Sequence, residues 1–121
     1  MSVVEQYARA YIVTDHDIRD DRTAVPVRLR YDPLEPQMVR VALPGPGARE
    51  WTFSRSLLEQ GLRAPTGTGE VRVWPCGRVQ TVVEFHSGQG VAVVQFETRA
   101  LLRFLRRTYM AAATAAAVAH R

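Results

Sequence analysis

Four arginines fall within nine residues near the end of the chain: Arg99, Arg103, Arg106 and Arg107. Guanidinium groups bind phosphates and carboxylates through paired hydrogen bonds. In a helix capped by Thr98, these arginines would share one side, opposite the apolar side chains of the same helix. They could therefore contact an anionic partner, and the alternative is an ordinary solvated helix face.

The histidines and acidic residues do not form a recognisable metal site. The three histidines lie far apart in the sequence, and the aspartates beside His16 lack the central glycine and closing glutamate of a calcium loop. These aspartates are Asp15, Asp17, Asp20 and Asp21. We expect a solvated hairpin end here rather than a metal site.

Other reactive side chains also argue against catalysis. Cys76 lies in a Pro-Cys-Gly-Arg segment that predicts a turn, with no helix N-terminus or paired histidine to activate the thiol. The glycine-rich segment Thr66–Gly69 precedes a strand, whereas phosphate binding favours a helix N-terminus. Nothing in the sequence brings Glu84 and Glu97 together as a carboxylate pair. We therefore predict no enzymatic activity and no cofactor.

Composition permits an anionic partner without choosing one. The 121 residues include 16 basic residues, all arginine, and 12 acidic ones, which gives a net charge of +4. A positive surface speeds encounters with nucleic acid, anionic lipid or acidic protein. Tyr31 and Trp74, each beside an arginine in an expected strand, could stack on single-stranded bases, so a nucleic-acid-binding module stays open as the alternative.

The length favours one domain, and we expect the protein to be cytoplasmic. No apolar run approaches the ~20 residues that span a bilayer, and the first ten residues lack the apolar core of a signal peptide. The single cysteine cannot form an intrachain disulfide, which suits a reducing compartment.

Alternating apolar and polar residues predict a mostly antiparallel sheet of about seven strands, since the connections between them are short. The predicted strands are residues 3–14, 24–31, 38–43, 50–53, 71–74, 79–86 and 91–97. Pro75 should end one of them, and the segment Ser87–Gly90 suits a tight turn.

Two helices complete the expected α+β fold. Ser54 can cap a short helix over residues 55–60, with Leu57 and Leu58 facing inward and Gly61 as a left-handed stop. In the C-terminal helix, apolar residues are expected on one side: Leu101, Leu102, Phe104, Leu105 and Tyr109. Residues 1–110 should form the domain, and the alanine-rich residues 111–121 either extend this helix or fray.

Two segments resemble a known family. One is L-R-Y-D-P-L-E-P-Q-M-V at residues 29–39, and the other runs from W-T-F-S-R-S-L-L-E-Q-G-L to P-T-G-T-G-E-V-R-V-W-P at residues 51–75. Their order and spacing resemble the SsgA-like proteins, an actinobacterial family of sporulation and cell-division proteins, over roughly residues 2–110. The residues that match look chiefly structural.

The resemblance implies a sheet-and-helix fold similar to the whirly-type single-strand nucleic-acid binders, assembly as trimers and no enzymatic activity. It also implies a role in septum positioning, through the tubulin-like division GTPase FtsZ or septal peptidoglycan proteins. We therefore expect a non-catalytic adaptor that is recruited from the cytoplasm to the septum. Its candidate partner contacts are Arg99, Arg103, Arg106, Arg107 and Trp74.

Overall fold

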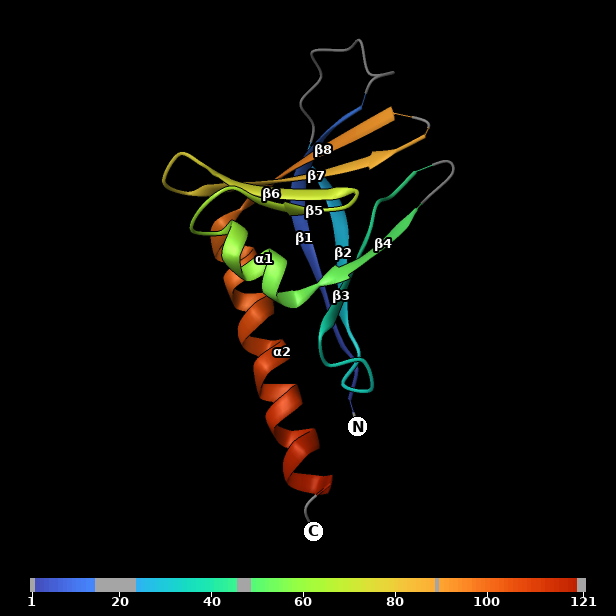
Figure 1. Ribbon diagram of the computed structural model, residues 1–121, viewed down its shortest axis with the longest axis vertical. Coiled ribbons are helices and arrows are strands. Elements are labelled where there is room, and N and C mark those ends of the chain that lie inside the picture. The colour runs from blue at the N-terminus through green and yellow to red at the C-terminus, as the bar shows by residue number, and fades with distance from the viewer. Residues whose placement is uncertain (1, 15–23, 46–48, 89, 120–121) are drawn as a thin grey trace.

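The structure is a computed structural model, and it describes residues 2–14, 24–45, 49–88 and 90–119. These residues form one curled antiparallel sheet with two helices on its inner side (Figure 1), which confirms the predicted α+β class. The strands are β1 (Val4–Thr14), β2 (Val25–Tyr31), β3 (Met38–Ala42), β4 (Glu50–Ser54), β5 (Thr66–Thr68), β6 (Val71–Cys76), β7 (Gln80–Ser87) and β8 (Gly90–Glu97). The helices are α1 (Arg55–Gly61) and α2 (Thr98–Ala119).

The sheet has the order β4-β3-β2-β1-β8-β7-β6-β5 and every pairing in it is antiparallel. Strand β1 is central, with Ala8 opposite Val27 of β2 and Ala10 opposite Phe96 of β8. All four side chains are buried, and an alanine opposite a larger side chain leaves room for close packing on this face. The first and last strands of the chain thus hold the two halves of the sheet together.

The sheet curls so that its two halves meet across the core. Trp51 on β4 stacks on Phe85 of β7 with ring centroids 5.0 Å apart, and Phe53 meets the same ring edge-on at 6.0 Å. Such aromatic contacts add to the free energy gained by burying the rings. The predicted alternation of Trp51 and Phe53 in a strand is confirmed.

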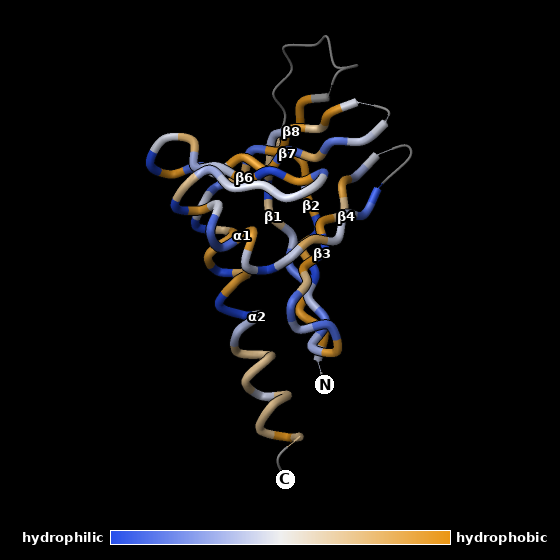
Figure 2. Tube along the Cα trace, viewed as in Figure 1, coloured by the Kyte–Doolittle hydropathy of each residue, from blue (hydrophilic) through white to orange (hydrophobic). Residues whose placement is uncertain are grey.

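Helix α2 packs one side against the inner face of the sheet. Leu101, Phe104, Leu105 and Thr108 are buried there. The helix continues through the alanine-rich stretch to Ala119, and this second half projects beyond the sheet as a weakly hydrophobic segment (Figures 1 and 2).

Helix α1 begins as the sequence predicts but ends differently. The Ser54 hydroxyl accepts a hydrogen bond from the Leu57 backbone N–H at 2.9 Å, and Leu57 and Leu58 are buried. Gly61 is not a left-handed stop: it is the last residue of the helix and has no positive φ. A Cβ there would lie 2.2 Å from Cγ1 of Val73, so this glycine instead allows α1 to approach β6 closely.

Two further predictions are corrected around β6. Strand β5 was missed, because its three residues around Gly67 become a strand only through pairing with β6. Pro75 does not end β6: the strand continues to Cys76, and Pro75 lies opposite Thr81. The predicted loop of aspartates around His16 lies outside the described residues, as does Gln89 in the predicted turn.

Candidate partner-binding surface

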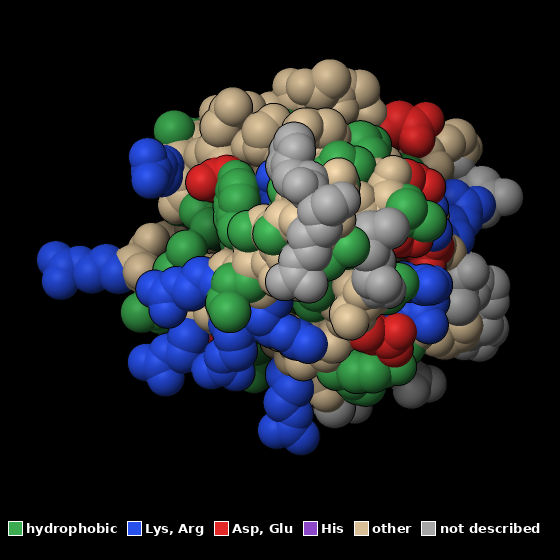
Figure 3. Space-filling view, turned by 90° about the horizontal axis from the view of Figure 1, so that it is seen from below, with side chains coloured by type: hydrophobic (Ala, Val, Ile, Leu, Met, Phe, Trp, Pro, Cys, Tyr) green, Lys and Arg blue, Asp and Glu red, His purple; other side chains and the backbone are tan. Residues whose placement is uncertain are grey.

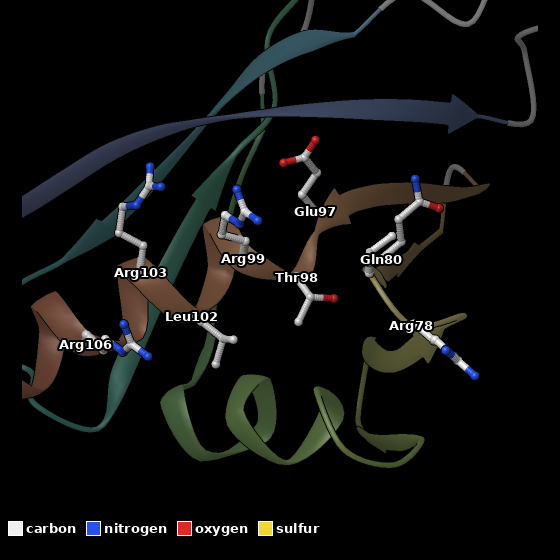
Figure 4. Close-up of a pocket in the computed structure, with 9 residues that line it drawn as sticks. Arg78, Gln80, Glu97, Thr98, Arg99, Leu102, Arg103 and Arg106 are labelled. Atoms are coloured by element: carbon white, nitrogen blue, oxygen red, sulfur yellow. The ribbon is translucent and has the colours of Figure 1, made fainter.

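Three of the four candidate helix arginines lie around one surface hollow of about 620 Å³. Arg99, Arg103 and Arg106 reach it from the first turns of α2, and Arg78 reaches it from the β6–β7 turn. Figure 4 shows Arg99 and Arg103 pointing together away from α1, while Leu102 points toward α1. We call this surface the arginine hollow.

The arginine hollow carries positive charge without internal neutralisation. Among the described residues, Arg78, Arg99, Arg103 and Arg106 make no ion pair or hydrogen bond through their side chains, although Glu97 also lines the hollow. Seen from below, arginines gather at the left and lower left of the molecule, and most visible acidic side chains lie at the right (Figure 3). An approaching anion would therefore meet uncompensated guanidinium groups.

Arg107 lies apart from the other three. Its Nη1 donates to the backbone oxygen of Glu5 at 3.2 Å and to Oε1 of Gln6 at 3.4 Å. Successive helical residues are rotated by about 100°, so Arg107 points toward β1 although it follows Arg106 directly. Arg107 therefore contacts β1 and does not line the arginine hollow with the other three.

The candidate aromatic residues have different surroundings. Trp74 is half-buried on the outer face of β6, opposite Val82, and does not line the arginine hollow. Tyr31 is only 1% exposed, and its hydroxyl donates to the Pro36 backbone oxygen at 3.2 Å. Tyr31 therefore cannot be a stacking platform for bases.

A second hollow of about 360 Å³ lies between α1 and α2. Its apolar lining includes Leu62, Leu102, Leu105 and Tyr109. Leu102 and Tyr109 were expected on the buried side of α2, but they are 42% and 44% exposed. Apolar residues on a second face of α2 are the sequence feature that could have revealed this surface. We call it the helix groove.

Tyr109 is fixed at one end of the helix groove by two side chains of α1. Its hydroxyl donates to Glu59, and the Arg55 guanidinium carbon lies 3.9 Å from its ring centroid. The hydrogen bond to Glu59 and burial raise the pKa of Tyr109, against the opposing charge of Arg55. The ring is thus held in place before any partner binds.

No catalytic or metal-binding set assembles among the described residues. Glu84 and Glu97 are separated along their strands, opposite Val93 and Gln80 respectively, so they do not form a pair. No three His, Cys, Asp or Glu side chains of the described ranges gather where they could hold a metal ion. Neither helix in the described part of the chain is long and apolar enough to cross a membrane.

The Thr98 hydroxyl, expected to cap α2, lies 2.8 Å from the Thr81 hydroxyl.

The fold and this surface define a small α+β protein with a basic helix face. Residues 25–116 match the model of the family described as Streptomyces sporulation and cell division protein, SsgA. The chain therefore belongs to the SsgA family, and the predicted resemblance is confirmed.

Relatives with this fold are named as cell-division proteins. The chain is 41% identical over 105 residues to sporulation-specific cell division protein SsgB of Salinispora tropica, covering 79% of this chain and 73% of that protein. It is 43% identical over 90 residues to SsgB of Streptomyces coelicolor, covering 69% of this chain and 65% of that protein. These names support a role in cell division and point away from an enzyme.

Two solved structures share the architecture. SsgB from a study of longitudinal cell division during sporulation of Streptomyces coelicolor superposes with a TM-score of 0.74 at 35% identity, covering 91% of this chain and 86% of that one. An SsgA-like sporulation-specific cell division protein from Thermobifida fusca gives a TM-score of 0.71 at 28% identity, covering 90% and 81%. This chain thus shares its overall fold with two other sporulation-specific cell division proteins.

Proposed function

We propose that this chain is a non-catalytic adaptor in sporulation-specific cell division. It would be recruited from the cytoplasm to the septum and would position the division machinery there by binding FtsZ or a septal peptidoglycan protein. The observation that carries the proposal is the arginine hollow, where Arg99, Arg103 and Arg106 have no internal counterion among the described residues. An acidic partner surface would supply the missing charges.

The adaptor would act as a homo-oligomer, which the family resemblance predicts to be a trimer. Exposed apolar side chains are available to build an interface, including Tyr7 and Val13 on β1 and Met110 on α2, at 63%, 53% and 70% exposure. Sedimentation velocity of the purified chain tests this part of the proposal. A monomer at micromolar concentration would contradict it.

Single-stranded nucleic-acid binding is the second candidate, because guanidinium groups also bind phosphates. The observation that favours it is the same arginine hollow. Burial of Tyr31 removes one of the two stacking platforms that this reading needs, and only Trp74 stays partly accessible. We therefore place the adaptor first.

Co-sedimentation with purified FtsZ and GTP, with a labelled single-stranded oligonucleotide as a parallel probe, separates the two functions. If the chain is an adaptor, it should sediment with the FtsZ filaments and should not bind the labelled oligonucleotide. The variant Arg99→Glu/Arg103→Glu/Arg106→Glu should stay in the supernatant, since three charges that would contact an acidic partner are reversed. Oligonucleotide binding that falls steeply as salt is raised, without filament binding, would favour the nucleic-acid reading instead.

A further inference from the structure

The arginine hollow and the helix groove form one continuous surface. Thr98, Leu102 and Arg106 line both of them. Leu102 lies at the junction, with its side chain directed toward α1 while Arg99 and Arg103 point to the other side (Figure 4). A ligand that enters the groove therefore meets apolar carbon and guanidinium groups within the same short path.

The charge of the combined surface is strongly one-sided. Arg63 lines the helix groove and, like the arginines of the hollow, has no side-chain ion pair among the described residues. Of the two carboxylates present, Glu59 already accepts the hydrogen bond from Tyr109, and Glu97 lies near Arg99 without a described ion pair (Figure 4). The positive groups thus exceed the carboxylates that could neutralise them from within the chain.

The two halves of the surface call for different ligand chemistry. Free phosphate or a purely acidic peptide would pair with the arginines but would leave Leu62, Leu102 and Tyr109 exposed to water. A purely apolar helix would cover these residues but would desolvate guanidinium groups without pairing them, which is unfavourable. Only a ligand with both properties satisfies the whole surface.

We propose that this continuous surface binds a short protein segment in which carboxylates stand next to large apolar side chains. An apolar side chain of the segment inserts between Leu62, Leu102 and Tyr109, and neighbouring carboxylates pair with Arg103 and Arg106. Buried apolar anchors beside bidentate arginine pairs are the usual source of binding energy in such contacts. The inference rests on the proposed adaptor function and names the partner chemistry that this site would recognise.

The geometry disfavours a nucleic-acid strand on the same surface. Sequence-tolerant binding of single strands relies on exposed aromatic faces. The Arg55 guanidinium carbon lies 3.9 Å from the centroid of the Tyr109 ring, and no other residue that lines the groove is aromatic. Bases would therefore find little to stack on.

Selection from a random-peptide display library on the immobilised full chain tests the proposal without presuming a sequence. We expect enriched peptides to combine Asp or Glu with Leu, Ile, Phe or Met. A synthetic copy of an enriched peptide, labelled for fluorescence anisotropy, then reports affinity. Failure to enrich any peptide, or enrichment of peptides without carboxylates, would overturn the proposal.

Matched variants locate the binding surface. The pair Arg103→Gln/Arg106→Gln should weaken the selected peptide by about tenfold or more, since two charge-assisted contacts are lost. Leu102→Ser should weaken it by about fivefold or more at unchanged charge, because the apolar anchor loses its contact. The control pair Arg49→Gln/Arg72→Gln changes charge equally at exposed positions outside both hollows and should change affinity by less than about twofold.

Circular dichroism of each variant verifies that the fold is kept. Equal loss of affinity in the control pair would overturn the assignment to this surface. A single-stranded oligonucleotide that displaces the peptide and binds with higher affinity than the peptide would overturn it too. The adaptor function fails separately: selected peptides would bind through the surface while no division protein co-sediments. Conversely, if the Arg103→Gln/Arg106→Gln pair and Leu102→Ser both still co-sediment with a division protein, the proposed surface is rejected and the adaptor function stands.

Discussion

Helix α2 has two sides that serve different purposes over the same few turns. Its inner side buries Leu101, Phe104 and Leu105 against the sheet, and Phe104 is 0% exposed. Its outer side carries Arg103 and Arg106, which find no internal counterion among the described residues. The comparison teaches that the inner side stabilises the fold, whereas the outer side is free to be used for recognition.

Strand arginines show that the missing counterions of the helix are not a general property of this arginine-rich chain. Arg28 lies 3.2 Å from Glu50, and Arg40 lies 3.0 Å from Glu35 and 3.8 Å from Glu50. These exposed pairs add little stability each, but they neutralise the sheet surface locally. The same residue type is therefore paired within the chain at one place and available at another.

Breaking the inner side should have the largest effect. Phe104→Ala removes a fully buried ring from between α2 and the sheet, and we expect the free energy of unfolding to fall by about 3–5 kcal/mol. Urea denaturation followed by circular dichroism measures this change. A loss below about 1 kcal/mol would mean that α2 does not carry the core as the structure indicates.

The close approach of α1 to the sheet gives the next largest effect. Gly61→Ala places a methyl group 2.2 Å from Cγ1 of Val73, so we expect a loss of about 1–3 kcal/mol in the free energy of unfolding despite the better helix propensity of alanine. Gly88→Ala is the matched control, because no atom lies within 4 Å of its added Cβ. Equal stability of the two variants in urea denaturation would contradict the close approach.

Removing the cap of α1 should cost less. Ser54→Ala leaves the Leu57 backbone N–H without its 2.9 Å acceptor, and we expect a loss of about 1 kcal/mol. Ser54→Asp, which restores an acceptor, should recover most of this loss in the same thermal or urea measurement. No difference between the alanine and aspartate variants would show that the cap is not what matters at this position.

The outer side should give the smallest effect on stability. Arg103→Gln/Arg106→Gln breaks no described contact, so we expect the free energy of unfolding to change by less than about 0.5 kcal/mol. Thermal unfolding at low and high salt is the measurement. A loss above 1 kcal/mol would place these arginines in the fold and erase the contrast between the two sides.

Local signals were predictable from the sequence because neighbouring residues decide them. Ser54 caps α1 through a residue three positions away, and Trp51 and Phe53 alternate within one strand. Gly61 could not be assigned correctly, because its role depends on Val73 in a strand that lies across the core. Sequence patterns report periodicity, whereas the close approach of two elements is a property of the assembled fold.

The candidate site was predictable only in part for the same reason. Arg99, Arg103 and Arg106 were found from their helical spacing, but the hydrogen bond of Arg107 to the Glu5 carbonyl depends on where β1 lies beside α2, which the sequence alone does not show. Arg78 and Leu62 were missed since they reach the surface from other elements. Their contribution follows from the way the sheet brings the β6–β7 turn and α1 beside α2.

The central place of β1 has a consequence for synthesis on the ribosome. This strand emerges first, yet Ala10 finds Phe96 only after nearly the whole sheet has been translated. Until then one edge of β1 exposes unpaired backbone groups, which are prone to pairing with other chains. Contacts between residues so distant in the chain also form slowly. The central pairing of the sheet therefore forms only after β8 has been made, so β1 stays half-paired while the strands between them are synthesised.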